Sequence, residues 1–388
     1  MSLRILAAAA AFLCMGTFAA IVPASAADQT AQAPAATAAP AAAPAATPAP
    51  AATAAPKDYV VSGFADLSFT HLSGYDGSIP GRVFDTANNY PNLQTLNGTL
   101  VKNGTLSGKL EVNLGSDADV MRSYGQPANT GFNITQLYLG YTSGVLAFTA
   151  GKFTTLAGEE YIRSGDNYNF SRSYLFGFAI PFTHTGVRVA YAPTPKLSLT
   201  AGVNRGWDAV QNTTAGGRAF EGSAAFNPTD KLGLTATVYT GKEPSSIATN
   251  AVAGTRTLLD LIGTYKATSK LTLVGNFDAA GQKNAFTDVT GTLAAGDASW
   301  RGFAGYANYQ FNPKWSGTLR GEVFSDPDGY RTGFSQVLHE GTATLGYAPS
   351  APLLFRLEYR ADHSSVPTLK NLDSTSQNTT AVEGIVKF

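Results

Sequence analysis

Acid–base chemistry in this chain would have to come from its four histidines, His71, His184, His339 and His363. A hydrolytic site needs a base held beside a nucleophile or an activated water. His71 and His363 are expected near the outer ends of strands that are separated by one neighbour, and Asp362 is adjacent to His363. A His–Asp pair of the protease kind is conceivable, although isolated surface histidines are the commoner arrangement. His184 is expected to make a structural hydrogen bond rather than to bind a metal.

Metal and cofactor chemistry have little support in the sequence. Cys14 is the only cysteine and lies in an N-terminal apolar segment, so neither a thiolate metal site nor a disulfide framework is expected. The sequence shows no histidine cluster with metal-ligand spacing and no glycine-rich phosphate loop between a strand and a helix. We therefore predict a protein that is not an enzyme and that uses no metal or cofactor.

Charged residues of both signs recur at alternate positions in several segments, which places them on one face of a β-strand. They are Lys109 and Glu111, Arg188, Arg320 and Glu322, Arg356, Glu358 and Arg360, and Glu383 and Lys387, together with Asp66, Asp260 and Asp278. In a barrel lumen, such ladders of opposite charge would set a field and select solutes by size and charge. The alternative is that these charges pair with each other and stiffen a polar wall.

The longest connection, at about residues 155–180, mixes charged and aromatic side chains. Its charged members are Glu159, Glu160, Arg163, Asp166 and Arg172, and it continues into the run Leu175-Phe176-Gly177-Phe178. This apolar run would be poorly placed in bulk water. We predict that the loop folds into a barrel mouth and constricts a pore, with Arg320, Arg356 and Arg360 opposite it. The alternative is a surface loop packed on its neighbours.

The elements that would position these residues are β-strands. From residue 57 onward apolar and polar residues alternate with a period of two, for example in 197–204, 232–238 and 271–277. Short turns rich in Asn, Asp, Ser, Pro and Gly alternate with long polar connections. Seven short and eight long connections join about sixteen strands, with fourteen and eighteen as alternatives because alternation is poor near residues 93–101.

Short turns that alternate with long loops are typical of an outer-membrane β-barrel. Within lipid every backbone N–H and C=O must be paired, so such a sheet has to close on itself. At about sixteen strands the interior is too wide for side chains of the wall to fill. We therefore predict an all-β fold, a transmembrane antiparallel up-and-down β-barrel over residues 57–388, with both termini on the periplasmic side.

The N-terminal segment predicts export. Arg4 supplies a positive charge, residues 5–22 are apolar, and Ala24-Ser25-Ala26 fits a cleavage site, so residues 1–26 are interpreted as a signal peptide. Beyond them no apolar stretch is long enough for a membrane helix. Residues 27–56 are almost entirely Ala, Pro and Thr and are predicted to be a disordered periplasmic linker, with a spacer toward the cell wall as the alternative.

Composition and the last residues agree with this location. The chain carries 27 basic and 27 acidic residues, so no basic patch supports nucleic-acid binding. Its 22 Phe, 17 Tyr and 40 Gly suit strands whose outer faces meet lipid. Strict alternation runs to Phe388, and a strand with a terminal aromatic is typical of barrels that assembly machinery recognises. We predict Phe388 to be an assembly signal.

Three stretches resemble a known family. A G-K-F-x-T-x-x-G-x-E sequence begins at Gly151, and N-Y-x-x-S-R-S-x-L-F-G-x-A-I-P-F-T-H-T-G-V-R runs from Asn167 to Arg188. Upstream lies Leu114-Gly115-Ser116-Asp117-Ala118. These stretches are similar to the OmpL-like family of outer-membrane β-barrel porins. The resemblance implies a barrel and a pore and brings no catalytic residues, while the Ala/Pro segment departs from the pattern.

These observations favour a porin in the outer membrane of a Gram-negative bacterium, with a water-filled channel for passive diffusion of small polar solutes or ions. Its partners would be outer-membrane lipid, the permeating solutes and the barrel-assembly machinery. Porins of this size are often trimers, so a homotrimer is also expected. The alternative is an outer-membrane anchor or adhesin barrel without a transport role, which a small, side-chain-filled barrel would favour.

Overall fold

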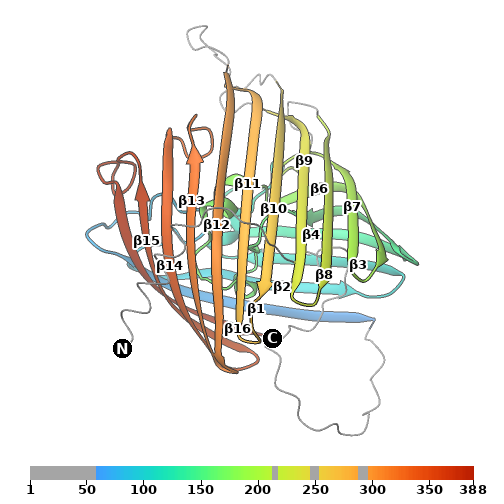
Figure 1. The fold of residues 1–388 in the computed structure, drawn as a ribbon, viewed down its shortest axis with the longest axis horizontal. Coiled ribbons are helices and arrows are strands. Elements are labelled where there is room, and N and C mark those ends of the chain that lie inside the picture. The colour runs from blue at the N-terminus through green and yellow to red at the C-terminus, as the bar shows by residue number, and fades with distance from the viewer. Residues whose placement is uncertain (1–57, 212–216, 245–252, 287–295) are drawn as a thin grey trace.

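The structure, a computed structural model, describes residues 58–211, 217–244, 253–286 and 296–388, so the predicted signal peptide (1–26) and linker (27–56) lie outside the described residues. The described chain is a β-barrel with a few short helical turns (Figure 1). The strands are β1 Tyr59–Leu72, β2 Pro91–Lys102, β3 Leu106–Leu114, β4 Phe132–Ser143, β5 Leu146–Thr154, β6 Thr183–Thr194, β7 Leu197–Asn204, β8 Ala219–Thr229, β9 Leu232–Glu243, β10 Gly254–Lys266, β11 Leu271–Phe286, β12 Gly296–Asn312, β13 Trp315–Asp326, β14 Gln336–Ser350, β15 Leu353–Ser364 and β16 Ser376–Lys387. The turns are α2 Ser116–Val120, the 3₁₀ turn η2 Ser164–Asp166 and the π-helical turn η3 Leu175–Ala179.

Every strand pairs with its neighbours in the sequence, and β1 pairs with β16 to close the barrel. The closing ladder is antiparallel and runs from Phe64 opposite Lys387 to Leu72 opposite Thr379. Closure leaves no strand with an unpaired edge, which is the condition for a sheet in lipid. The predicted sixteen-stranded antiparallel barrel is therefore confirmed. Within the described residues, no helix has both the length and the apolar character needed to cross a membrane.

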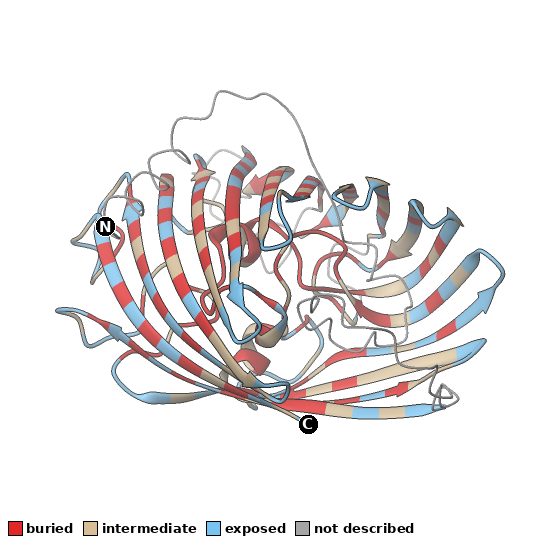
Figure 2. Cartoon of the chain, turned by 60° about the horizontal axis from the view of Figure 1, so that its bottom comes forward, coloured by how far each residue is buried: buried red, intermediate tan, exposed pale blue. Residues whose placement is uncertain are grey.

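The predicted alternation appears as two different faces of the wall. Buried and exposed residues follow each other along most strands (Figure 2). On β4, for example, Leu137 and Leu139 are exposed on the outer face, whereas Gln136 is buried on the inner one. Aromatic pairs lie near the short turns, such as Trp315 and Tyr347, whose rings stack at 4.4 Å. The outer face therefore has the apolar surface and aromatic girdle that suit a bilayer.

The weak alternation of the second strand has a physical cause. In the β1–β2 ladder, Asp66 pairs with Thr95 but the next residue, Leu67, pairs with Leu93. One extra residue, Gln94, is thus inserted, and Gln94 and Thr95 are both buried. Such a β-bulge shifts the inside–outside pattern by one position. A strict period of two therefore fails in the sequence although the strand is complete.

Phe388 closes the seam between β1 and β16. It donates its backbone N–H to the carbonyl oxygen of Gly63 at 2.9 Å and accepts the Gly63 N–H at 2.7 Å. A Cβ at Gly63 would collide with the Phe388 ring and with the carbonyl oxygen of Asn97, so only glycine lets the ring lie there. The side chain is still 69% exposed, so the ring belongs to the outer surface rather than to a core.

We expect Phe388→Ala to lower the amount of barrel in the outer membrane while leaving the refolded barrel stable in detergent. The substitution keeps both backbone hydrogen bonds, and burial of the ring in lipid contributes at most roughly 1.5–3 kcal/mol. Heat-dependent gel mobility measures stability, and membrane fractionation measures yield. Phe355→Ala removes an exposed aromatic from β15 and is the matched control, with normal yield expected. A normal yield for Phe388→Ala would contradict the prediction.

Candidate functional site

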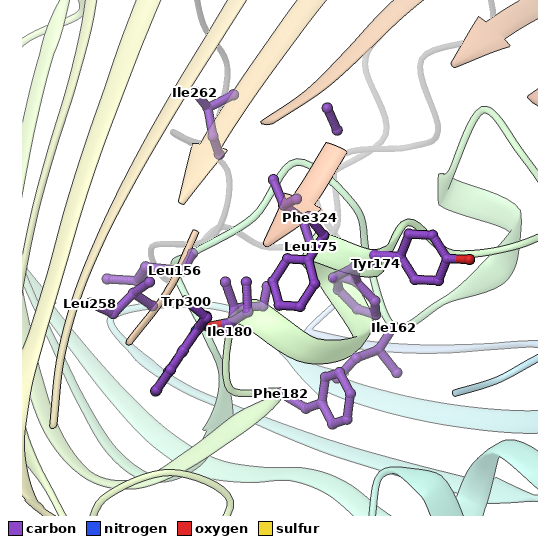
Figure 3. Packing of buried hydrophobic residues seen from close by; sticks show 14 of the residues in the cluster. Leu156, Ile162, Tyr174, Leu175, Ile180, Phe182, Leu258, Ile262, Trp300 and Phe324 are labelled. Atoms are coloured by element: carbon purple, nitrogen blue, oxygen red, sulfur yellow. Dashed lines mark hydrogen bonds between the residues drawn. The ribbon is translucent and has the colours of Figure 1, made fainter. Parts of the chain in front are cut away.

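The third long connection, residues 155–182, lies inside the barrel between β5 and β6. Its apolar side chains pack with inward-facing residues of the opposite wall in one buried cluster (Figure 3). From the loop come Leu156, Ile162, Tyr174, Leu175, Phe176 and Ile180, and from the wall Leu258, Ile262, Trp300, Phe324 and Leu338. The Trp300 indole also donates a hydrogen bond to the Ala179 carbonyl oxygen at 3.0 Å. The loop is thus a packed inner layer rather than a chain in solvent.

Carboxylates of the wall accept backbone N–H groups of this loop. Glu322 on β13 accepts from Tyr174 and from Leu175, both at 2.6 Å. Glu358 on β15 accepts from Phe170 at 2.8 Å and from Ser171 at 3.0 Å. At the start of the loop, Asp260 on β10 accepts the Gly158 N–H at 3.1 Å. Buried backbone N–H groups need such partners, because an unpaired N–H group removed from water is costly.

Arginines of the wall donate to backbone carbonyls of the same loop. Arg320 contacts the carbonyl oxygen of Ser171 at 2.6 Å, and Arg360 contacts that of Arg172 at 2.6 Å. Arg356 donates to the carbonyl oxygens of Ser164 and Asn167. These guanidinium groups therefore contact the loop directly. The sequence-based prediction had placed them opposite the loop, on the other side of a pore.

The same arginines are neutralised by carboxylates. Arg320 forms ion pairs with Glu160 of the loop at 2.7 Å and with Glu340 at 2.6 Å. Arg356 pairs with Glu383 at 2.8 Å, and Arg360 pairs with Asp362 at 2.7 Å. Since each of these three arginines has a close counter-charge, its positive charge is largely cancelled. The geometry corresponds to the alternative reading of the charge ladders, in which they pair and stiffen the structure.

The opposite wall has its own pairs, away from the loop anchors. Lys109 and Glu111 on β3 are 2.8 Å apart, and Arg188 on β6 and Glu221 on β8 are 2.6 Å apart. The Arg188 guanidinium also stacks 3.9 Å from the centre of the Phe153 ring. The Lys109 side chain stays 18% exposed, so it is the member of this group that water still reaches.

The tip of the loop carries the interior charges that remain most accessible. Arg163 and Asp166 form a 3.5 Å ion pair, and their side chains are 32% and 35% exposed. Arg163 lies over the Phe64 ring of β1, and the Lys387 ammonium contacts the Gly165 carbonyl oxygen at 3.3 Å. Arg172 is instead buried and donates to the carbonyl oxygens of Tyr161, Ile162 and Phe170, which ties the loop to itself.

Glu159 differs from its neighbour Glu160, because no ion pair among the described residues involves its carboxyl group. Burial, together with the nearby negative charges of Glu160 and Asp260, raises the pKa of Glu159 to about 8. The carboxyl group is therefore mostly protonated at neutral pH and ionises only as the pH rises through about 8. Glu159 lies near Tyr168, whose side chain is exposed.

Two further loops enter the mouth, which the sequence analysis missed. Arg82, in the loop after β1, forms ion pairs with Asp85 and with Asp362, the latter at 2.7 Å. Arg331, in the loop after β13, donates to the Phe178 carbonyl oxygen and lies 5.3 Å from the centre of the Trp300 ring. The contacts of Arg82 with Asp362 and of Arg331 with Phe178 join residues far apart in the sequence, so no local sequence pattern indicated them.

The histidines do not form a catalytic arrangement. His363 is exposed on the outer face, next to Ser376, whereas Asp362 is buried on the inner face, because adjacent strand residues point to opposite sides. His71 contacts Asn89 instead of a carboxylate. His184 is buried, hydrogen-bonded to the Gly206 carbonyl oxygen at 3.0 Å and stacked on Tyr239. Among the described residues, no group of three or more potential ligands could hold a metal.

Comparisons with known proteins agree with this geometry. The family described as "Putative beta-barrel porin-2, OmpL-like" matches residues 59–388. A search among curated proteins finds no match. Among solved structures, the outer membrane channel DcaP of Acinetobacter baumannii is 14% identical with a TM-score of 0.60, over 85% of this chain and 97% of that one. An anion-selective porin from Comamonas acidovorans is 12% identical with a TM-score of 0.58, over 85% and 99%. A trimer form of OmpT of Vibrio cholerae is 13% identical with a TM-score of 0.56, over 85% and 99%.

We expect Glu322→Ala to loosen the inner loop without unfolding the barrel. The substitution leaves two buried N–H groups without acceptors, and each such loss costs about 1–3 kcal/mol. Hydrogen exchange at residues 173–178 should accelerate by at least roughly tenfold, while the strands remain protected. Glu111→Ala removes a wall carboxylate whose ion pair and hydrogen bonds go to the wall residues Lys109, Asn97 and Gln136, and should leave exchange at residues 173–178 unchanged. Equal exchange in both variants would show that the carboxylate does not hold the loop.

Proposed function

This chain belongs to the OmpL-like beta-barrel porin-2 family, and on that basis we propose that it is an outer-membrane channel for passive diffusion of ions and small polar solutes. The observation that carries the proposal is the group of water-accessible charges inside a closed barrel, Lys109, Arg163 and Asp166. A barrel that served only as an anchor would gain nothing from hydrated charges at this place.

We propose that the path runs between the loop tip and the wall formed by β3 and β4. The strands on the other side, from β10 to β15, are covered by the buried part of the loop. Lys109 pairs across the ladder with Tyr138, whose side chain is half-buried, and the tip contributes Arg163, Asp166 and the exposed Tyr168. These residues would form the narrowest part of the channel, with Glu159 beside them.

The fold supports an orientation with the short turns on the periplasmic side and the long loops outside, which is the usual arrangement of such barrels. Both ends of the barrel chain would then be periplasmic. We also propose a homotrimer, since a trimer form is recorded for the similarly folded OmpT. The mass of the purified detergent complex, measured by light scattering, tests this.

Removal of residues 159–170 is expected to raise single-channel conductance in planar bilayers and the size of sugars that enter liposomes. The segment contains the tip and its removal widens the aperture. Removal of residues 371–373, three exposed residues of the last long loop, is the control and should leave conductance unchanged. Folded wild-type barrels that neither conduct nor admit solutes would instead favour the anchor or adhesin function.

Cation preference is expected to grow as the pH rises from about 7 to 9. The raised pKa of Glu159 means that its negative charge appears in this window. Reversal potentials under a salt gradient measure this change in selectivity. The change should be smaller at high salt, because the Debye screening length falls to about 3 Å at 1 M. Glu159→Gln should abolish the pH dependence. A pH dependence that persists in Glu159→Gln would assign it to another group.

A further inference from the structure

Three basic residues stand side by side on the outer surface, where β7, β8 and β9 meet the long loops. Asn204 pairs with Ala219 at the end of the β7–β8 ladder, and the residues just beyond this pair, Arg205 and Arg218, line one groove. Ala219 in turn pairs with Gly241 at the end of the β8–β9 ladder, and Gly217, the residue before Arg218, lies against Lys242. All three side chains are exposed. The row therefore spans three neighbouring strand ends at one height.

Like charges that lie directly opposite each other on adjacent strands are destabilising. The closest carboxylates in these strands are unavailable to the row, because they face inward. Glu221 is bound to Arg188, and Glu243 is buried and accepts the Trp207 N–H at 2.8 Å. Among the described residues, no carboxylate forms an ion pair with Arg218 or Lys242. Arg218 and Lys242 are thus suited to an anion from outside the chain.

A groove of about 520 Å³ lies at Arg205 and Arg218 and continues onto the membrane-facing wall. Its lining includes Gly186, Val187, Val203, Arg205, Gly217 and Arg218. A Cβ at Gly217 would collide with the side chain of Lys242, so glycine lets the β8 end approach β9 and leaves the groove open. Val187 is 57% exposed on the outer face. The groove is therefore basic at its upper end and apolar at its lower end.

We propose that this groove binds a phosphorylated membrane lipid. Guanidinium groups match the geometry of phosphate oxygens and bind them through paired, charge-assisted hydrogen bonds. An acyl chain would lie on Val187 and Val203, as expected for a ligand held in the bilayer. With the long loops outside, the lipid would come from the outer leaflet. The site lies on the outer wall and does not depend on whether the channel conducts.

The test measures thermal unfolding of the full barrel in a zwitterionic detergent. The probes are dihexanoyl phosphatidic acid, dihexanoyl phosphatidylcholine and inorganic phosphate. Phosphatidic acid should raise the unfolding temperature of the wild type more than either other probe, because a ligand that binds only the folded state stabilises it. The apparent affinity for phosphatidic acid should fall by roughly tenfold or more in Arg218→Gln/Lys242→Gln, since two charge-assisted contacts are lost.

The controls separate the lipid site from general effects of charge. Arg301 is exposed on β12, and its partners across the ladders, Ala279 and Ser325, are uncharged, so Arg301→Gln should bind phosphatidic acid like the wild type. Without lipid, the double variant should unfold at the same temperature as the wild type or higher, because the repulsion in the row is relieved. An equal response to inorganic phosphate, or equal affinity in all three proteins, would overturn the proposal.

Discussion

The structure depends on one constraint, that every backbone N–H and C=O removed from water must find a partner. In the wall, the constraint is met by closing β1 on β16, down to the two hydrogen bonds between Gly63 and Phe388. In the lumen, it is met differently. The inner loop has little regular secondary structure, so side chains of the wall supply the partners, with Glu322 and Glu358 as acceptors and Arg320 as a donor.

This use of charge changes how the lumen is understood. An arginine that holds a backbone carbonyl and a glutamate at once is a structural clamp, and its positive charge is largely cancelled where it stands. In the proposed channel, selectivity would then depend on the few groups that keep contact with water. Removing a clamp such as Arg320 would uncover buried partners and disturb the loop, so its effect on permeation would be indirect.

The sequence was sufficient to predict the barrel, because side chains of a strand alternate between its two faces. One face meets lipid and the other meets the lumen, so apolar and polar residues alternate in the sequence. It failed to predict the apolar inner cluster. Leu258 and Leu259 are neighbours, as are Val323 and Phe324, and a period of two assigns only one residue of each pair to the lipid face. The second residue of each pair was the overlooked signal for a packed lumen. The clamps were missed because Glu358 and Phe170 are 188 residues apart, and no local pattern encodes such a contact.

The positions of the clamps also have a consequence for the order of assembly. The loop leaves the wall after β5, yet the wall residues that bind it come much later in the chain. Asp260 lies 102 residues after its partner Gly158, and Glu358 lies 188 residues after Phe170. Glu383 lies 219 residues after Ser164. During folding, the loop cannot acquire its final shape until β10 to β16 have been added. The inner layer is therefore formed late, by the same strands that complete the cylinder, and an incompletely closed barrel would lack this layer as well as its last strands.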